Sequence, residues 1–259
     1  MMQKLLHAKL VGSGNPLLVL HGFLGMGDNW ISLAKKYAEH GLKVHLIDQR
    51  NHGKSFHADE MNYEEMSADL FEYIQHYNLV DIILLGHSMG GKTAMDFSVK
   101  HPDLIKKLIV VDISPKFYAP HHNFLFDALA LVSFEKAKTR KDIEMQLSQK
   151  IDSLPIRQFL MKNLKRNTQQ KFQWKANIDV LRESLDELGE ALPAHSTFKG
   201  ETIFIKGEKS PYIQPEDSKL IRAHFPNSKL ETIRNAGHWL HAEQPEQFLR
   251  KTLDFIKAV

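Results

Sequence analysis

The segment 82–93 holds residues that fit two kinds of enzyme site at once. In one interpretation, a G-x-S-x-G pattern centred on Ser88 forms the turn that presents a nucleophilic serine between a strand and a helix. In the other, the stretch Gly86–Thr93 matches G-x-x-x-x-G-K-[ST], a loop that cradles nucleotide phosphates beside a lysine, here Lys92. Both need an apolar strand before the segment and a helix after it, and the sequence predicts both. The remainder of the chain must therefore decide between them.

The phosphate-loop interpretation has support outside the segment. Thr93 occupies the position of the Mg²⁺-binding hydroxyl, and the apolar strand Leu108–Asp112 ends in an aspartate, as a metal-binding Walker-B strand does. However, this interpretation explains neither the glycine-rich loop that follows Leu20 nor the late histidine His238. We keep a P-loop-type nucleotide-binding protein as the alternative function.

The hydrolase interpretation requires a base, because a serine hydroxyl is a weak nucleophile at neutral pH. Of the 15 histidines, His238 is the best candidate, because it lies in a loop between the last predicted strand and the final helix. That place puts His238 at the carboxyl edge of the sheet, the edge that also carries Ser88. His238 also comes last in the chain, as the order serine, acid, histidine requires. His87 is too close to Ser88 to fold back onto it.

A serine hydrolase also needs two hydrogen-bond donors for the oxyanion of its tetrahedral intermediate. The loop Leu20–Gly25 follows the second predicted strand, and the backbone N–H of Phe23 can point at the site. The second donor is expected to be the N–H of Met89, directly after the nucleophile. We expect no cofactor and no metal, because the histidines lack metal-ligand spacing and the chain has no cysteine.

The elements that position these residues alternate between short apolar strands and amphipathic helices. Strands are expected at Lys4–Val11, Leu17–Leu20, Lys43–Asp48, Ile82–Leu85, Leu108–Asp112, Thr202–Ile205 and Lys229–Ile233. Helices are expected at Asp28–His40, Tyr63–Tyr77 and Met89–Lys100, after Pro215, and from about Pro245. Between Phe117 and Leu192 the pattern is helical, with no convincing strand. This alternation predicts an α/β protein whose parallel sheet is covered on both faces and interrupted by a helical excursion.

Three motifs carry a resemblance to a known family. His-Gly at 21–22, the run Asp48–Ser55 and Gly-His-Trp at 237–239 occur around the serine elbow in the order that the α/β-hydrolase superfamily shows, and the likeness covers nearly the whole chain. We assign no chemistry to Asp48–Ser55, which we interpret as a structural turn beside the site. The runs at 110–115 and 237–243 resemble YbfF-like bacterial esterases and their mitochondrial relatives most closely.

The resemblance implies an architecture as well as a chemistry. It implies the α/β-hydrolase fold, with a mostly parallel central sheet flanked by helices and a helical cap inserted after the sixth strand. The hydrolase core is expected at residues 1–116 and 197–259, and the helical cap (lid) at residues 117–196.

The acid of the catalytic triad departs from the commonest pattern of the superfamily. Most members carry it in the loop after the strand that corresponds to Thr202–Ile205, where this chain has Ser210 in place of aspartate. Some relatives carry the acid one strand earlier, at the position of Asp112. An aspartate there can reach the imidazole, fix its tautomer and stabilise the imidazolium. We expect Asp112 to be the acid, with Glu208 as the alternative.

The expected function is that of a serine carboxylesterase acting on small-molecule acyl esters, with acyl-CoA thioesters as further candidates, through a Ser-His-Asp triad and an acyl-enzyme. C–C bond hydrolases share the same triad. A net charge of +3 without a clustered basic face predicts no nucleic-acid partner. No run approaches the roughly 18 apolar residues that cross a membrane, and the first residues lack a secretory signal. We therefore expect a cytoplasmic monomer or homodimer with no membrane contact.

Overall fold

A seven-stranded sheet forms the centre of the protein, for which the computed structural model describes residues 4–120 and 123–258. The strand order is β1-β3-β2-β4-β5-β8-β9, and neighbouring strands are parallel except for β1 and β3. The strands span β1 (Ala8–Val11), β2 (Asn15–Leu20), β3 (Leu42–Ile47), β4 (Ile82–His87), β5 (Ile105–Val111), β8 (Glu201–Gly207) and β9 (Ser228–Ile233). The mostly parallel sheet that the sequence predicts is confirmed.

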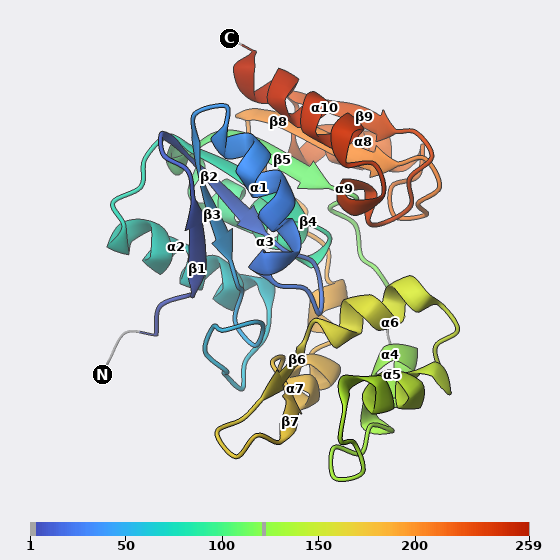
Figure 1. Cartoon of the computed structure of the whole chain (residues 1–259). Coiled ribbons are helices and arrows are strands. Elements are labelled where there is room, and N and C mark those ends of the chain that lie inside the picture. Colours follow the sequence, from blue (N-terminus) through green and yellow to red (C-terminus); the bar gives the residue numbers. More distant parts are fainter. Residues whose placement is uncertain (1–3, 121–122, 259) are drawn as a thin grey trace.

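Helices cover both faces of this sheet, which explains why its central strands are almost continuously apolar. Leu84 and Leu108 share a hydrophobic cluster with residues of α2, α3 and α8, whereas Leu85 and Ile109 share one with residues of α1 and α10. Figure 1 shows α1 and α10 on the near side of the sheet. The covering helices span α1 (Ile31–Ala38), α2 (Tyr63–His76), α3 (Met89–Lys100), α8 (Asp217–His224) and α10 (Pro245–Lys257), and the short helical turns span η1 (Gly27–Trp30), η2 (Pro102–Leu104), η3 (Glu187–Gly189) and α9 (Leu240–Glu243).

Most expected elements are confirmed to within a few residues. The helix predicted over Met89–Lys100 has the predicted bounds. The helix expected over Asp28–His40 begins instead as the 3₁₀ turn η1 and becomes α-helical only at Ile31. Strand β2 begins at Asn15, two residues before the expected start at Leu17, because Asn15 already pairs with Leu42.

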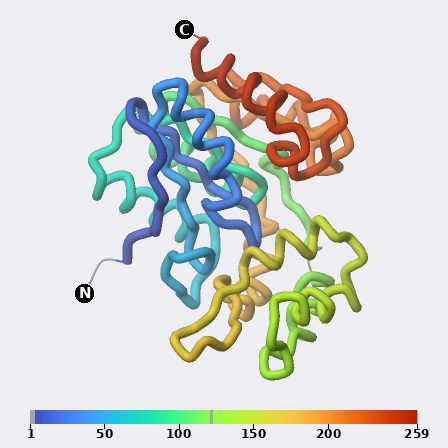
Figure 2. The backbone as a smooth tube through the Cα atoms, in the orientation of Figure 1, coloured from blue at the N-terminus to red at the C-terminus, as the bar shows by residue number. Residues whose placement is uncertain are grey.

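Between β5 and β8 the chain leaves the sheet and forms a separate layer over its carboxyl edge, seen in green to orange in Figures 1 and 2. We call residues 117–196 the insert. Its elements span α4 (Asn123–Ala130), α5 (Arg140–Ser148), α6 (Leu154–Met161), β6 (Leu164–Arg166), β7 (Phe172–Trp174) and α7 (Ile178–Glu183). The insert has its own hydrophobic cluster, to which the core contributes Leu24 and Met89. The insert is thus packed onto the residues that flank the serine elbow.

Two expectations about the insert are wrong. The sequence predicts no strand there, yet β6 and β7 form an antiparallel pair. Each strand has only three residues, which is too short for the alternation of apolar and polar residues to show in the sequence. The insert also follows β5, the fifth strand along the chain, rather than a sixth, because the described residues contain only one antiparallel strand, β1, before the parallel set.

The parallel strands bring the predicted site residues to one edge of the sheet. Ser88 directly follows β4, Asp112 directly follows β5, and His238 lies in the loop between β9 and α9. Among residues 4–120 and 123–258, none of the helices combines the length with the apolar character that crossing a bilayer requires.

Candidate active site

Ser88 lies on a strained turn between β4 and α3. Its backbone φ is 54° and its ψ is −118°, a left-handed conformation that is unusual for a residue with a side chain. Its N–H donates a 2.9 Å hydrogen bond to the carbonyl of Val111, and its own carbonyl accepts bonds from the N–H groups of Gly91 and Lys92. These bonds hold the strained backbone in place on both sides. The side chain remains 7% exposed.

The glycines on either side of Ser88 are required by close backbone contacts. A Cβ atom on Gly86 would lie 2.1 Å from the carbonyl oxygen of Gly90, and one on Gly90 would lie 2.4 Å from that of Leu20. Both distances are far below contact distance and involve backbone atoms that cannot turn away. The G-x-S-x-G pattern therefore reflects how tightly the elbow packs against β2.

His238 and Asp112 are in direct contact. Nδ1 of His238 lies 2.7 Å from Oδ2 of Asp112, and the carboxylate is completely buried. The other carboxylate oxygen accepts the N–H of Gly207 at 3.0 Å, and the Ser210 hydroxyl donates to Oδ2. The imidazole of His238 is 21% exposed and stacks on the ring of Tyr212, with ring centres 4.0 Å apart. A buried carboxylate with these donors holds the imidazole with its Nδ1–H toward Asp112 and its Nε2 free to accept a proton.

Glu208, the alternative acid, is exposed and bonds the backbone of Asn235 instead of the imidazole of His238. Its Oε2 accepts a 2.8 Å hydrogen bond from the backbone N–H of Asn235. The structure therefore brings Asp112, and not Glu208, to the histidine. Ser210 occupies the loop position at which most members of the superfamily carry an aspartate, and its hydroxyl donates to Asp112, which follows the neighbouring strand β5.

Two histidines hold the loop that contains Phe23. Nε2 of His21 accepts the N–H of Gln49 at 3.1 Å, and Nε2 of His52 accepts the N–H of Leu24 at 3.2 Å. Burial lowers the pKa of His21 to about 4 and that of His52 to about 3, so both rings are neutral and can accept through Nε2 at physiological pH. The loops 21–25 and 48–55 thus interlock through uncharged imidazoles.

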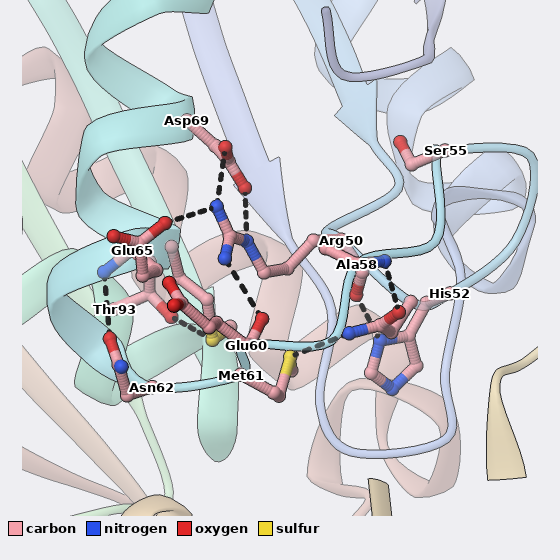
Figure 3. A network of polar contacts seen from close by, with 12 residues as sticks. Arg50, His52, Ser55, Ala58, Glu60, Met61, Asn62, Glu65, Asp69 and Thr93 are labelled. Carbon is pink, nitrogen blue, oxygen red and sulfur yellow. Dashed lines mark hydrogen bonds and ion pairs between the residues drawn. The ribbon is translucent and has the colours of Figure 1, made fainter. Parts of the chain in front are cut away.

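Arg50 anchors the second of these loops to helix α2, as Figure 3 shows. Its guanidinium forms a fork on Asp69, with Nε 2.6 Å from Oδ2 and Nη2 2.9 Å from Oδ1. A further bond joins Nη2 to Glu65, and Nη1 bonds the carbonyl of Glu60. A bidentate pair of this kind fixes direction as well as distance. The structural role expected for residues 48–55 therefore takes a specific form, which is to support the loop of Phe23.

Ser88 and His238 both line a cavity of about 230 Å³. Phe23 lines the same cavity, and Met89 lines a second, smaller one that also reaches Ser88. The N–H of Met89 belongs to the first turn of α3, where backbone donors have no partner within the helix. The structure thus gathers Ser88, His238, Asp112, Phe23 and Met89 at one place.

Lys92 is not placed to contact a nucleotide phosphate. Its side chain is 3% exposed, and its ammonium donates to the carbonyls of Lys116 and Glu190. Burial lowers its pKa to about 7. Thr93 donates its hydroxyl to the carbonyl of Met89 within the helix. The alternative P-loop interpretation is therefore wrong, because its two phosphate-site side chains are used in packing.

The sequence did not predict the contact between the ring of His87 and the backbone of His238. Nε2 of His87 lies 2.9 Å from the carbonyl oxygen of His238, and burial keeps the pKa of His87 well below its usual value. The neutral ring thus donates to the loop that carries His238. In the sequence, the position of His87 beside Ser88 is the one feature that points to this contact. Within the part of the chain that the structure describes, no three histidine or acidic side chains are grouped as a metal site.

The fold and this arrangement of residues are those of an α/β hydrolase. The sequence pattern of the family described as "alpha/beta hydrolase fold" matches residues 15–245, so the chain belongs to that family.

Named relatives lie within the same family. The chain is 37% identical over 247 residues to the sn-1-specific diacylglycerol lipase ABHD11 of Mus musculus, covering 93% of this chain and 80% of that protein. It is 31% identical to the esterase YbfF of Escherichia coli, covering 92% and 91% of the two chains. A solved structure, "Marine microorganism esterase", is 46% identical with a TM-score of 0.94, covering 98% of this chain and all of that one. The likeness to YbfF-like esterases is confirmed.

Proposed function

We propose that the protein is a serine hydrolase that cleaves carboxylic esters through a triad of Ser88, His238 and Asp112. The observation that carries the proposal is the 2.7 Å contact between His238 and the buried Asp112, at the sheet edge where Ser88 is presented on a left-handed turn. The names of the relatives, which include esterases and lipases, support the same class of reaction.

In the first half of the reaction, Oγ of Ser88 attacks the ester carbonyl carbon while Nε2 of His238 takes its proton. The N–H groups of Phe23 and Met89 donate to the oxyanion that forms. Asp112 accepts Nδ1–H throughout and stabilises the imidazolium. The intermediate then collapses, and His238 returns the proton to the leaving alkoxide, which departs as the alcohol and leaves an acyl-serine.

In the second half, His238 removes a proton from water, and the hydroxide attacks the acyl-serine. Collapse of this intermediate releases the carboxylic acid, and His238 returns the proton to Oγ. A thioester follows the same steps with a thiol as the leaving group, so we include acyl thioesters in the proposed substrate class. No metal or cofactor takes part in any step of this proposal.

A fluorophosphonate probe tests the proposal, because it reacts only with a serine that a neighbouring base activates. We expect the wild type to be labelled and Ser88→Ala and His238→Ala to lose the label. Ser98→Ala provides a matched control. Ser98 is a buried serine on α3, the helix that follows Ser88, and its hydroxyl donates to a backbone carbonyl. A folded wild type that is not labelled and hydrolyses no ester would overturn the proposal.

A further inference from the structure

Ser88 lies between two cavities of unequal size. The larger has a volume of about 230 Å³ and the smaller about 60 Å³. Ser88, Phe23 and Tyr212 line both cavities, so the two cavities meet at the serine, with Phe23 and Tyr212 at their boundary. An ester bound at Ser88 has two arms, the acyl chain and the alcohol, and each cavity can receive one of them.

The position of His238 determines which arm of the ester lies in which cavity. His238 lines the larger cavity but not the smaller one. A leaving oxygen that is protonated by Nε2 must lie within hydrogen-bond reach of that atom. The alcohol must therefore leave through the larger cavity. Met89, a proposed oxyanion donor, lines only the smaller cavity, on the side that remains for the acyl chain.

Resting on the proposed function, we propose that the enzyme is selective for short acyl groups carried on bulky, apolar alcohols. On this measure of volume a single water needs about 10–15 Å³, so 60 Å³ has room for about four to six groups of that size, which corresponds to an acyl chain of about four to six carbons. The larger cavity has nearly four times that space, and its walls include the apolar side chains of Phe124, Leu125, Ile156, Phe159 and Trp239.

The smaller cavity cannot widen without breaking bonds between the core and the insert. Leu185 and Leu188 of the insert line it together with Ile113 of the core. The hydroxyl of Tyr63 on α2 donates a 2.7 Å bond to the carbonyl of Leu188, and the hydroxyl of Tyr118 donates a 2.6 Å bond to the carbonyl of Tyr212. Burial raises the pKa of both tyrosines, so both hydroxyls stay protonated and keep donating. These bonds fix the length of acyl chain that the cavity accepts.

The test is a series of p-nitrophenyl esters with acyl chains of two to twelve carbons, in which the leaving group is constant. We expect kcat/KM of the wild type to peak at four to six carbons and to fall at least tenfold by ten carbons. Leu188→Ala removes three carbons from the wall, so its optimum should move to chains about three carbons longer. Leu185→Ala serves the same purpose if Leu188→Ala does not fold.

Ile156→Ala is the matched control, because it removes apolar volume from the larger cavity. This variant should leave the dependence of kcat/KM on acyl-chain length unchanged. It should alter the ratio of the rates on ethyl acetate and 1-naphthyl acetate, two esters that differ only in the alcohol. The proposal is overturned if octanoate or longer esters, or long-chain diacylglycerols, are cleaved at least as fast as butyrate. It is also overturned if Ile156→Ala moves the acyl optimum and the wall variants do not. Fluorophosphonate labelling of Ser88 separates these outcomes from failure of the proposed function, since an active serine with a long-chain preference refutes only the cavity assignment.

Discussion

The backbone N–H of Leu24 donates a 3.2 Å hydrogen bond to Nε2 of His52, a residue 28 positions away that does not line either cavity at Ser88. His52 in turn donates Nδ1–H to the carbonyl of Arg50 at 2.9 Å, and Arg50 is forked onto Asp69. Phe23 directly precedes Leu24. The direction of a proposed oxyanion donor is thus set by a chain of bonds that ends on helix α2.

Replacing His52 should therefore impair turnover more than substrate binding. In His52→Ala the loop loses its acceptor, and we expect kcat on p-nitrophenyl butyrate to fall about tenfold while KM changes less than threefold, because an oxyanion donor acts mainly in the transition state. His57→Ala is the control, since His57 is exposed and its ring bonds the carbonyl of Lys175. An equal loss in both variants, or a loss confined to KM, would contradict this role.

The assignment of the acid predicts a large difference between two conservative variants. Asp112→Asn keeps the size of the side chain but loses the charge that orients the imidazole, so kcat should fall by about three to four orders of magnitude. Glu208→Gln should retain activity within about twofold, because the exposed carboxylate of Glu208 accepts the backbone N–H of Asn235, a bond that a glutamine oxygen can also accept. Steady-state kinetics of the two purified variants tests this prediction. An inactive Glu208→Gln variant together with an active Asp112→Asn variant would show that Glu208, and not Asp112, is the acid.

Ser210 offers a second place for the acid. Its hydroxyl already donates to the oxygen of Asp112 that contacts His238, so a carboxylate at position 210 lies close to the same imidazole. We expect Ser210→Asp to recover activity at least tenfold in the Asp112→Asn background. In the wild-type background the same change places two buried carboxylates together and should lower both activity and Tm. If the double variant folds but its activity is not recovered, a carboxylate at position 210 does not reach the imidazole as we expect.

Lys92 should make stability depend on pH above neutrality. Its pKa is about 7 in the folded protein because burial penalises the charge, whereas an unfolded lysine titrates near 10.5. Between these values the unfolded state binds more protons, so the free energy of unfolding rises with pH from this group. In Lys92→Met that rise should be reduced by up to about 1 kcal/mol per pH unit. Urea unfolding at pH 7, 8 and 9 measures it, with the exposed Lys35→Met as control; identical slopes in all three proteins would exclude the effect.

The sequence predicted the parts of the site that depend on local pattern and sheet topology. The place of Ser88 on the turn between β4 and α3 could be predicted because the elbow requires Gly86 and Gly90 in the chain itself. The place of His238 at the same edge could be predicted because parallel strands end at one edge of the sheet. The strand pair β6 and β7 was not predicted, because strands of three residues are too short to show an alternation of apolar and polar residues.

The environment of Lys92 was missed for a different reason. Its acceptors, the carbonyls of Lys116 and Glu190, lie 24 and 98 positions away and leave no side-chain signature in the sequence. The choice between Asp112 and Glu208 likewise depended on which carboxylate the fold turns toward the imidazole. The unequal cavities at Ser88 depend on side chains from the core and the insert together, so no single segment predicts them.

The ammonium of Lys92 bonds the chain just before the insert, at Lys116, and again within its final residues, at Glu190. Both ends of the insert are therefore tied to one atom on the helix that begins beside the nucleophile. Such a junction marks where a foreign segment can be grafted onto this core, provided that it presents a carbonyl oxygen at the position of Glu190 and an apolar face to Leu24 and Met89. Chimaeras joined at these two carbonyls should keep the esterase machinery while acquiring the selectivity of the donor.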